Sequence, residues 1–420
     1  MVSHNAFYAQ SGGVTAVINA SAAGVIAEAK THPETIGTLY AGRDGILGAL
    51  TEELIDIGAE SEESIAALLH TPAGAFGSCR YKLKSLTEHR AQYERLIEVF
   101  KAHDIRYFFY NGGGDSQDTA HKVSQLSEKM GFPITCIGVP KTMDNDLPVT
   151  DCCPGFGSVA KYTAVSMLEA SFDVASMQRT STKVFVMEVM GRHAGWVAAS
   201  AGLARDERGL GPDIILFPEI PLDEPRFLAA VDRAVQERGF CMIAVSEGAK
   251  DAEGEFLSSA GNTDAFGHAQ LGGVAPVIVD KIKKHGGYKC HWAVCDYLQR
   301  SARHIASKTD VDQAFELGRA AVRFAVEGEN AVMPVIVREA DSPYRWHIDR
   351  APLAQVANVE RTLPRHYISD NGFEITDAAR RYLLPLIEGE AYPPYRNGLP
   401  DYRVLDKAII PKKCPVFNEL

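Results

Sequence analysis

Short, uninterrupted apolar runs alternate along this chain with longer segments in which apolar and polar residues are mixed. The apolar runs predict strands at residues 6–10, 105–110, 134–139, 183–189, 214–217 and 242–245. The mixed segments predict helices at residues 14–30, from about residue 116, around residues 196–199 and at residues 224–238. Strands that are apolar on both faces are typical of parallel sheets covered by helices on both sides. We therefore expect an α/β fold with doubly wound, Rossmann-like topology.

The last third of the chain is less regular. It predicts a helix near residues 310–327, a strand near residues 331–337 and a helix near residues 376–387, followed by a Pro-rich loop at residues 392–395. A length of 420 residues corresponds to two or three domains at about 150 residues each. A first boundary near residue 150 is expected.

Composition excludes several classes of function. The net charge is −11, from 43 basic and 54 acidic residues, whereas sequence-independent nucleic-acid binding needs a basic field. A few converging cations can still make one cleft positive for a small anion. The eight cysteines lack zinc-ligand spacing and predict reduced thiols in a cytoplasmic protein. We expect no leader and no membrane span, since the first residues lack a basic, apolar leader pattern and no apolar run reaches the length of a span.

Glycines follow two of the predicted strands. Gly12 and Gly13 follow the first, and they would let the backbone approach a phosphate at the start of a helix, or they serve a tight turn only. Residues 112–114 are three successive glycines, followed by Asp115 and Ser116. Asp115 could hold Mg²⁺ beside a phosphate, or Asp115 or Ser116 caps the helix.

The turn after the strand at residues 134–139 carries the strongest chemical signal. Residues 140–146 hold a lysine, a hydroxyl, an amide and two carboxylates. Phosphoryl transfer needs a base for the attacking hydroxyl and a cation for the developing charge, and Asp144 and Lys141 are the candidates. A solvated polar loop is the alternative. Arg192, Glu247 and Arg300 lie in other turns or short polar segments, where each alone is more often part of a surface salt bridge.

Together, and in this order, these segments resemble the phosphofructokinase family over most of residues 5–305. Residues 142–146 are similar to the TIDND loop of that family, which implies that Asp144 is the base for the 1-hydroxyl of the sugar. Residues 190–192 match its MGR motif, which grips the sugar phosphate. The fructose 6-phosphate contacts implied by the resemblance are Thr142, Met143, Asp144, Lys183, Met190, Gly191, Arg192, Glu247, His291, Tyr297 and Arg300. Lys183 and His291 stand where the family has residues from a neighbouring subunit, so a homodimer or homotetramer with shared sites is implied.

The resemblance also implies the phosphoryl donor. Pyrophosphate-dependent members carry an Asp where Asp115 stands and a Lys where Lys141 stands. Two unit charges ~4 Å apart at an effective dielectric of about 20 interact by roughly 4 kcal/mol, so a carboxylate there would repel the α-phosphate of ATP. The implied pyrophosphate contacts are Gly13, Arg80, Lys82 and Lys141, with Asp115 also counted among the catalytic residues.

The resemblance implies Mg²⁺ as cofactor, yet Gly114 stands where the family has its metal-binding Asp. Either Asp115 takes over that role, or pyrophosphate and water hold the metal. The implied architecture has two Rossmann-like domains with the active site in the cleft between them. Residues 1–150 would bind the donor, residues 151–330 the sugar phosphate, with the chain crossing back between the two, and residues 331–420 would pack on both. ATP-dependent transfer, sedoheptulose 7-phosphate as acceptor and a non-catalytic regulatory subunit of the same fold stay open.

Overall fold

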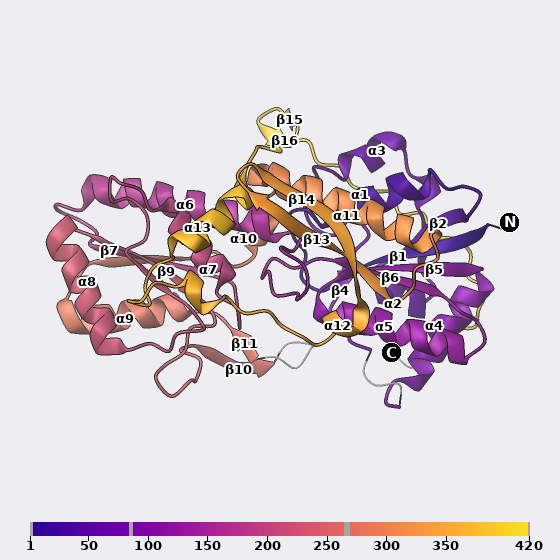
Figure 1. The fold of residues 1–420 in the computed structure, drawn as a ribbon, viewed down its shortest axis with the longest axis horizontal. Coiled ribbons are helices and arrows are strands. Elements are labelled where there is room, and N and C mark those ends of the chain that lie inside the picture. Colours follow the sequence, from indigo (N-terminus) through magenta and orange to yellow (C-terminus); the bar gives the residue numbers. More distant parts are fainter. Residues whose placement is uncertain (1–2, 84–86, 264–268, 419–420) are drawn as a thin grey trace.

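The computed structural model describes residues 3–83, 87–263 and 269–418, in which helices flank two large sheets (Figure 1). The predicted α/β fold is confirmed. The larger sheet has eight strands in the order β14-β13-β6-β5-β1-β2-β3, with β4 paired to β1. Its strands are β1 (His4–Ser11), β2 (Ile36–Gly42), β3 (Leu54–Asp56), β4 (Ser78–Cys79), β5 (Ile105–Gly112), β6 (Thr135–Pro140), β13 (Val332–Asp341) and β14 (Tyr344–Pro352).

Helices cover both faces of this larger sheet because its central strands are apolar on both sides. In β1, Phe7 and Ala9 are buried in one apolar cluster and Ala6 and Tyr8 in another, as the twofold alternation of a strand requires. The first cluster includes α2 (Ile46–Leu50), α4 (Arg90–Ala102) and α5 (Gly114–Lys129). The second includes α1 (Ile18–Ala29) and α11 (Lys308–Val326), which pack on each other. The short α3 (Glu62–Ala67) begins after its N-cap Ser61.

The second sheet is fully parallel, with strand order β12-β7-β9-β8. Its strands are β7 (Val184–Val189), β8 (Ile214–Leu216), β9 (Cys241–Ser246) and β12 (Cys290–Val294). One face packs against α6 (Phe156–Met177) and α7 (Trp196–Ala201), and the other against α8 (Glu224–Arg238) and α9 (Val274–Gly286). The sheet forms the left part of Figure 1. Helix α10 (Asp296–Ser301) follows β12.

The C-terminal segment contacts both sheets. Strand β13 pairs parallel with β6, and β14 pairs antiparallel with β13. Helices α12 (Leu353–Val356) and α13 (Asp377–Leu383) follow, and Tyr382 and Leu383 are buried in the same apolar cluster as Trp196. Two small hairpins, β10 (Ser259–Thr263) with β11 (Ala269–Leu271) and β15 (Tyr395–Arg396) with β16 (Leu399–Pro400), complete the strands. The division of the chain at residues 150 and 330 stays a prediction.

The described residues include no helix that is both long and apolar enough to cross a membrane. The six strands predicted before residue 250 are β1, β5, β6, β7, β8 and β9, and the strand predicted near residues 331–337 is β13. The predicted helix at residues 224–238 is α8, which begins after the N-cap Asp223 and ends at Gly239 in the left-handed conformation.

Candidate active site

A cleft of about 700 Å³ lies where the two sheets face each other. The turns that line it follow β1, β5 and β6 of the larger sheet and β7, β9 and β12 of the second. All these turns lie at the carboxyl ends of parallel strands, where open α/β sheets bind their ligands. The predicted site residues that line the cleft are Gly13, Arg80, Asp115, Lys141, Thr142, Met143, Asp144, Met190, Arg192, Glu247, Tyr297 and Arg300.

Three cationic side chains converge on the first turn. The ammonium of Lys141 donates a hydrogen bond of 2.6 Å to the carbonyl oxygen of Gly13. A Cβ atom on Gly13 would lie 2.7 Å from Nη1 of Arg300 and 3.6 Å from Nη2 of Arg80. Glycine at this position therefore leaves space in which two guanidinium groups and an ammonium can meet. The arrangement is suited to an anion with several charges.

Burial and, to a smaller extent, the neighbouring guanidinium groups of Arg300 and Arg80 together lower the pKa of Lys141 to about 8, against the opposing effect of Asp144 and Asp146. Lys141 is nearly inaccessible, with 4% of its surface exposed. Binding an anion in front of the ammonium would offset this cost, because an opposite charge favours the charged form of a lysine.

Neighbouring turns hold the first turn in place. Ser78 of β4 donates from its hydroxyl to the carbonyl oxygen of Gly12 at 2.8 Å, and the amide of Gly12 donates to the carbonyl oxygen of Cys79 at 2.9 Å. The hydroxyl of Ser116, at the start of α5, donates to that of Ser11 at 2.8 Å. These bonds connect the two glycine turns, and the Gly12 bonds also fix the strand that leads to Arg80.

Asp144 lines the cleft, and its pKa is higher than is usual for an aspartate. Burial, together with the carboxylates of Asp146 and Glu247, raises its pKa to about 7, against the opposing effect of Lys141 and Arg192. The backbone amide of Asp144 donates to the hydroxyl of Thr142 at 3.1 Å. A carboxylate with a pKa near neutrality is suited to accept a proton from a substrate hydroxyl.

Asp115 lies in the first turn of α5 and faces the cleft. One of its carboxylate oxygens is 2.5 Å from the ammonium of Lys82, which does not itself line the cleft. The predicted contact of Lys82 with pyrophosphate stays a prediction. Within the described residues, no group of three or more His, Cys, Asp or Glu side chains is placed to hold a metal ion.

On the second sheet, the turns after β7 and β9 interlock. Glu247 accepts a hydrogen bond of 3.4 Å from the amide of Gly191, and the hydroxyl of Ser246 donates to the carbonyl oxygen of Gly191 at 2.5 Å. A Cβ atom on Gly248 would lie 1.9 Å from the carbonyl oxygen of Arg192. Only glycine permits this approach, which places Arg192 and Glu247 side by side at the cleft.

Helix α10 contributes Tyr297 and Arg300 from the end of β12. The guanidinium group of Arg300 lies 3.7 Å from the centre of the Tyr297 ring. From there Arg300 reaches Gly13 on the opposite wall. The resemblance places Arg300 among the sugar-phosphate contacts, whereas the structure brings it to the turn predicted for pyrophosphate, so it spans the cleft.

Gly191, a predicted sugar contact that bonds to Glu247 and Ser246, does not itself line the cleft, and Lys183 and His291 lie away from it within the chain. The ammonium of Lys183, just before β7, donates to the carbonyl oxygen of Gln178 at 2.6 Å. His291 is exposed on β12. Neither lines the cleft, which is compatible with the expectation that they serve a neighbouring subunit.

Several residues that line the cleft were not predicted: Glu188, Glu360, Gly272 and Gly273. The carboxylate of Glu188 accepts from the amides of Gly273 at 2.9 Å and Ala275 at 2.8 Å. A charged residue within an apolar strand is a signal that could have found it. Gln299, which lies in the segment from Tyr297 to Arg300 that the sequence singles out, also lines the cleft and accepts from the amide of Met190 at 3.2 Å.

A comparison with known families identifies the chain. The family described as Phosphofructokinase matches residues 5–325. The chain belongs to the phosphofructokinase family. The match includes every turn that lines the cleft except the segment with Glu360, so this cleft is the candidate active site of a phosphofructokinase.

Two relatives are similar to this chain over nearly their full length. It is 67% identical over 413 residues, 98% of each chain, to pyrophosphate--fructose 6-phosphate 1-phosphotransferase of Methylococcus capsulatus. The protein of the same name from Halomonas elongata is 63% identical over 418 residues and all of both chains. The crystal structure of pyrophosphate-dependent phosphofructokinase from Nitrosospira multiformis superposes with a TM-score of 0.92 at 61% identity, covering 99% of this chain and 100% of that one.

Proposed function

We propose that this phosphofructokinase transfers a phosphoryl group from pyrophosphate to the 1-hydroxyl of fructose 6-phosphate, which gives fructose 1,6-bisphosphate and phosphate. The observation that carries the proposal is one cleft that holds both a carboxylate with a pKa of about 7, at Asp144, and a cluster of cations around Gly13. The relatives that are 67% and 63% identical are named for this reaction.

The proposed reaction is an in-line displacement. Asp144 accepts the proton of the 1-hydroxyl of the sugar. The oxygen of this hydroxyl attacks the nearer phosphorus of pyrophosphate. The new O–P bond forms, the bond to the bridging oxygen breaks, and phosphate leaves with the bridging oxygen. Lys141 and Arg80 neutralise the charge that develops on the transferred group and on the leaving phosphate. Since the bond that breaks in the donor is the anhydride bond of pyrophosphate, we expect the reaction to be readily reversible.

The other wall would hold the sugar. Arg192 can bind the 6-phosphate as a bidentate donor, and Glu247 can accept hydrogen bonds from sugar hydroxyls. Thr142, Met143, Met190, Gly191, Tyr297 and Arg300 complete the proposed sugar contacts. The position of Arg300 between the two walls further suggests that it contacts both phosphorylated substrates.

We propose Mg²⁺ as the cofactor, held by Asp115 together with phosphate oxygens and water. Asp115 faces the cleft, and Mg²⁺ is commonly bound by one or two carboxylates plus substrate phosphates. The described residues offer no group of three or more His, Cys, Asp or Glu side chains around one point, so they fit a Mg²⁺ ion that is bound mainly by the substrate better than one bound by protein ligands alone. When bound, Mg²⁺ would neutralise charge on the phosphate oxygens of pyrophosphate.

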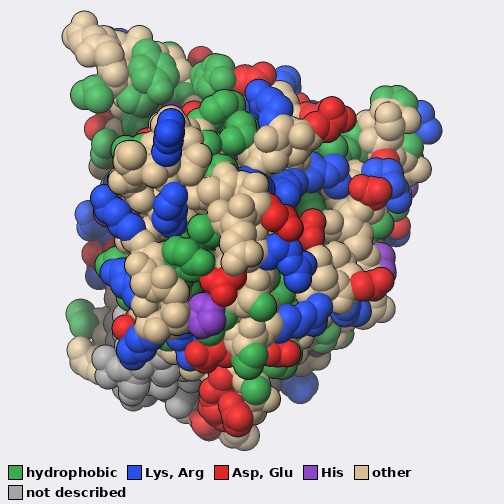
Figure 2. All heavy atoms as spheres, turned by 90° about the vertical axis from the view of Figure 1, so that its left-hand side faces the viewer, with side chains coloured by type: hydrophobic (Ala, Val, Ile, Leu, Met, Phe, Trp, Pro, Cys, Tyr) green, Lys and Arg blue, Asp and Glu red, His purple; other side chains and the backbone are tan. Residues whose placement is uncertain are grey.

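We further propose a cytoplasmic homodimer or homotetramer with shared sites and no nucleic-acid or membrane partner. Lysines and arginines are interspersed with acidic side chains on the end of the molecule that carries the second sheet (Figure 2). A nucleic-acid-binding face would instead gather one sign of charge. All eight cysteines are free, as in reducing compartments.

An assay of the purified chain tests the proposed function. We expect turnover of fructose 6-phosphate with pyrophosphate and Mg²⁺. In the reverse direction, we expect transfer of the 1-phosphoryl group of fructose 1,6-bisphosphate to phosphate, which gives pyrophosphate and fructose 6-phosphate. Turnover with ATP and none with pyrophosphate would contradict the donor. No turnover with either donor would support a regulatory subunit. Parallel assays with sedoheptulose 7-phosphate establish the acceptor.

A further inference from the structure

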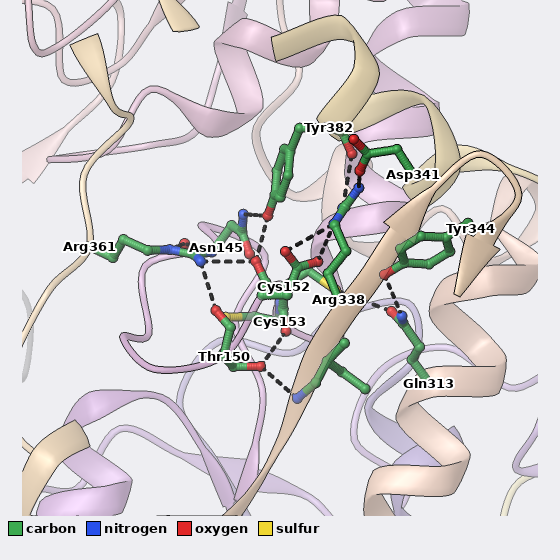
Figure 3. Close-up of polar contacts among 12 residues, drawn as sticks. Asn145, Thr150, Cys152, Cys153, Gln313, Arg338, Asp341, Tyr344, Arg361 and Tyr382 are labelled. Carbon is green, nitrogen blue, oxygen red and sulfur yellow. Dashed lines mark hydrogen bonds and ion pairs between the residues drawn. The ribbon is translucent and has the colours of Figure 1, made fainter. Parts of the chain in front are cut away.

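The C-terminal segment touches the loop that carries the candidate base. The side chain of Arg361 donates to three backbone carbonyl oxygens of this loop: that of Asn145 at 2.9 and 3.2 Å, that of Thr150 at 2.7 Å and that of Asp151 at 2.9 Å. Its backbone amide donates to the carbonyl oxygen of Asp146 at 2.7 Å. Figure 3 shows the guanidinium group of Arg361 directed at Asn145 and Thr150. One arginine therefore fixes the peptide planes on both sides of Asp146.

Asn145 stands between the two carboxylates of the loop in an uncommon conformation. Its φ is +55°, in the left-handed region, and it is fully buried. Its side-chain oxygen accepts from the amide of Cys153 at 3.0 Å, and its amide group donates to the hydroxyl of Tyr382 at 3.1 Å. A backbone of this kind persists only when its surroundings hold it. Besides Cys153, the partners that hold Asn145 are Arg361 and Tyr382, both from the C-terminal segment.

The same segment also contacts the loop after β7. The guanidinium group of Arg361 lies 4.8 Å from the centre of the Trp196 ring, and the indole N–H of Trp196 donates to the carbonyl oxygen of Arg361 at 3.3 Å. Glu219 accepts from the amide of Gly195 at 2.8 Å and from that of Leu363 at 2.9 Å. The loop that ends at Gly195 begins with the residues around Arg192. Arg361 therefore contacts both the loop with Asp144 and the helix that follows the loop with Arg192.

We infer that Arg361 is a positioning residue for phosphoryl transfer: it sets the Asp144 loop on the larger sheet at a fixed place relative to the Arg192 loop on the second sheet. The inference rests on the proposed roles of Asp144 and Arg192. Since Arg361 does not line the cleft, it acts through the backbone of the loop. Lysine cannot replace it, because an ammonium lacks the planar set of donors that reaches three carbonyl oxygens.

The test compares the variant Arg361→Lys with a matched control, Arg380→Ala. Arg380 also comes from the C-terminal segment and donates to two backbone carbonyl oxygens, those of Gly202 and Leu203, at 2.8 and 3.3 Å, but it does not contact the Asp144 loop. We expect Arg361→Lys to lower kcat by about 10- to 100-fold, the cost of a misplacement on the order of 1 Å, while each KM changes less than about threefold. The control should keep kcat near that of the parent.

A second variant covers the case in which Arg361→Lys does not fold. Tyr382→Phe keeps the buried ring and removes the hydroxyl that binds Asn145 and donates to the carbonyl oxygen of Asp151. It should lower kcat more than KM and leave the melting temperature within a few degrees of the parent. An unchanged kcat in a folded Arg361→Lys or Tyr382→Phe protein, or an equal loss in Arg380→Ala, would overturn the inference. If the parent is active but Asp144→Asn is not impaired, the proposed base is wrong, and this outcome is separate from that of Arg361.

Discussion

The ammonium of Lys141 lies 2.6 Å from the carbonyl oxygen of Gly13, so the turn after β6 is fixed to the turn after β1. The two residues are 128 positions apart in the sequence and approach each other because their strands end at the same edge of the sheet. A ligand held by the Gly13 turn therefore lies directly in front of Lys141.

Lys141→Met should reduce kcat for the pyrophosphate reaction by about 100- to 1000-fold, because one preorganised charge on the transferred group is lost. The matched control is Lys161→Met, which removes another poorly accessible lysine that donates to a backbone carbonyl oxygen, that of Gly389 at 2.7 Å, away from the cleft. Steady-state rates and melting temperatures of both variants check the prediction. Equal losses of activity in the two would refute a specific role for Lys141.

Asp144→Asn should lower the activity and, above neutral pH, raise the stability of the protein. Loss of the general base lowers kcat by about 10²- to 10⁴-fold. Because burial and the nearby carboxylates raise the pKa of Asp144 to about 7, its ionisation opposes folding. This unfavourable contribution is absent below the ordinary pKa of an aspartate and is fully present above pH 7. The variant should therefore unfold at a higher temperature than the parent at pH 8 and at about the same temperature at pH 4.

The pH profile of kcat/KM should have two limbs. Asp144 must be deprotonated to act as base, and its pKa of about 7 makes activity fall below neutrality. Lys141 must be protonated, and its pKa of about 8 makes activity fall above that pH. The profile is thus a narrow bell between these values.

A variant distinguishes these limbs from titration of the substrates. Glu247 is one of the charges that raise the pKa of Asp144. Glu247→Gln should therefore move the acidic limb to lower pH and leave the alkaline limb in place, whatever its effect on KM for the sugar. If the acidic limb does not move, it belongs to a substrate phosphate and not to Asp144.

The sequence predicted those cleft residues that lie in the turns directly after strands. Turns with glycines, cations and carboxylates after β1, β5, β6, β7 and β9 gather in one cleft, because parallel strands present their carboxyl ends to the same edge. The residues in these turns are local in sequence, so their approach needs only the correct assignment of strands. The apolar runs predicted four of the eight strands of the larger sheet and three of the four strands of the second.

Contacts between residues far apart in the sequence do not follow from local patterns of residue types. Arg361 lies in an irregular segment 216 positions from Asn145, and no periodicity indicates that it reaches the Asp144 loop. Helix α6 was not predicted, since it is buried on several sides and its small polar residues Ser158 and Thr163 are as inaccessible as its apolar ones. The pairing of Lys82 with Asp115 depends on the fold of the turn after β4, which side-chain types do not determine.

Asp115→Gly should widen the choice of donor. The resemblance implies that this carboxylate repels the α-phosphate of ATP, but its pairing with Lys82 at 2.5 Å offsets part of that charge. The repulsion is then smaller than for an isolated carboxylate, and kcat/KM for ATP should rise by about 10- to 100-fold, short of the thousandfold that roughly 4 kcal/mol corresponds to. Rates with both donors in Asp115→Gly check this. An unchanged preference would mean that the donor is selected elsewhere.

Lys82→Met is the companion measurement. It leaves the Asp115 carboxylate without its ion-pair partner, so discrimination against ATP should become stronger. A gain of ATP activity in this variant would contradict the electrostatic account.

Mixing two impaired variants tests whether sites are shared between subunits. His291 is exposed on β12 next to Trp292, which is 46% exposed, and α10 adds Leu298 at 67%. Such an exposed apolar surface is typical of an interface. If His291 enters the neighbour's site, a mixed dimer of Asp144→Asn and His291→Ala has one site with both changes and one with neither. Co-expressed variants should then exceed the summed activity of the separate proteins at low fructose 6-phosphate. Activity equal to that sum in a confirmed mixed dimer, or a monomer by light scattering, would rule out shared sites.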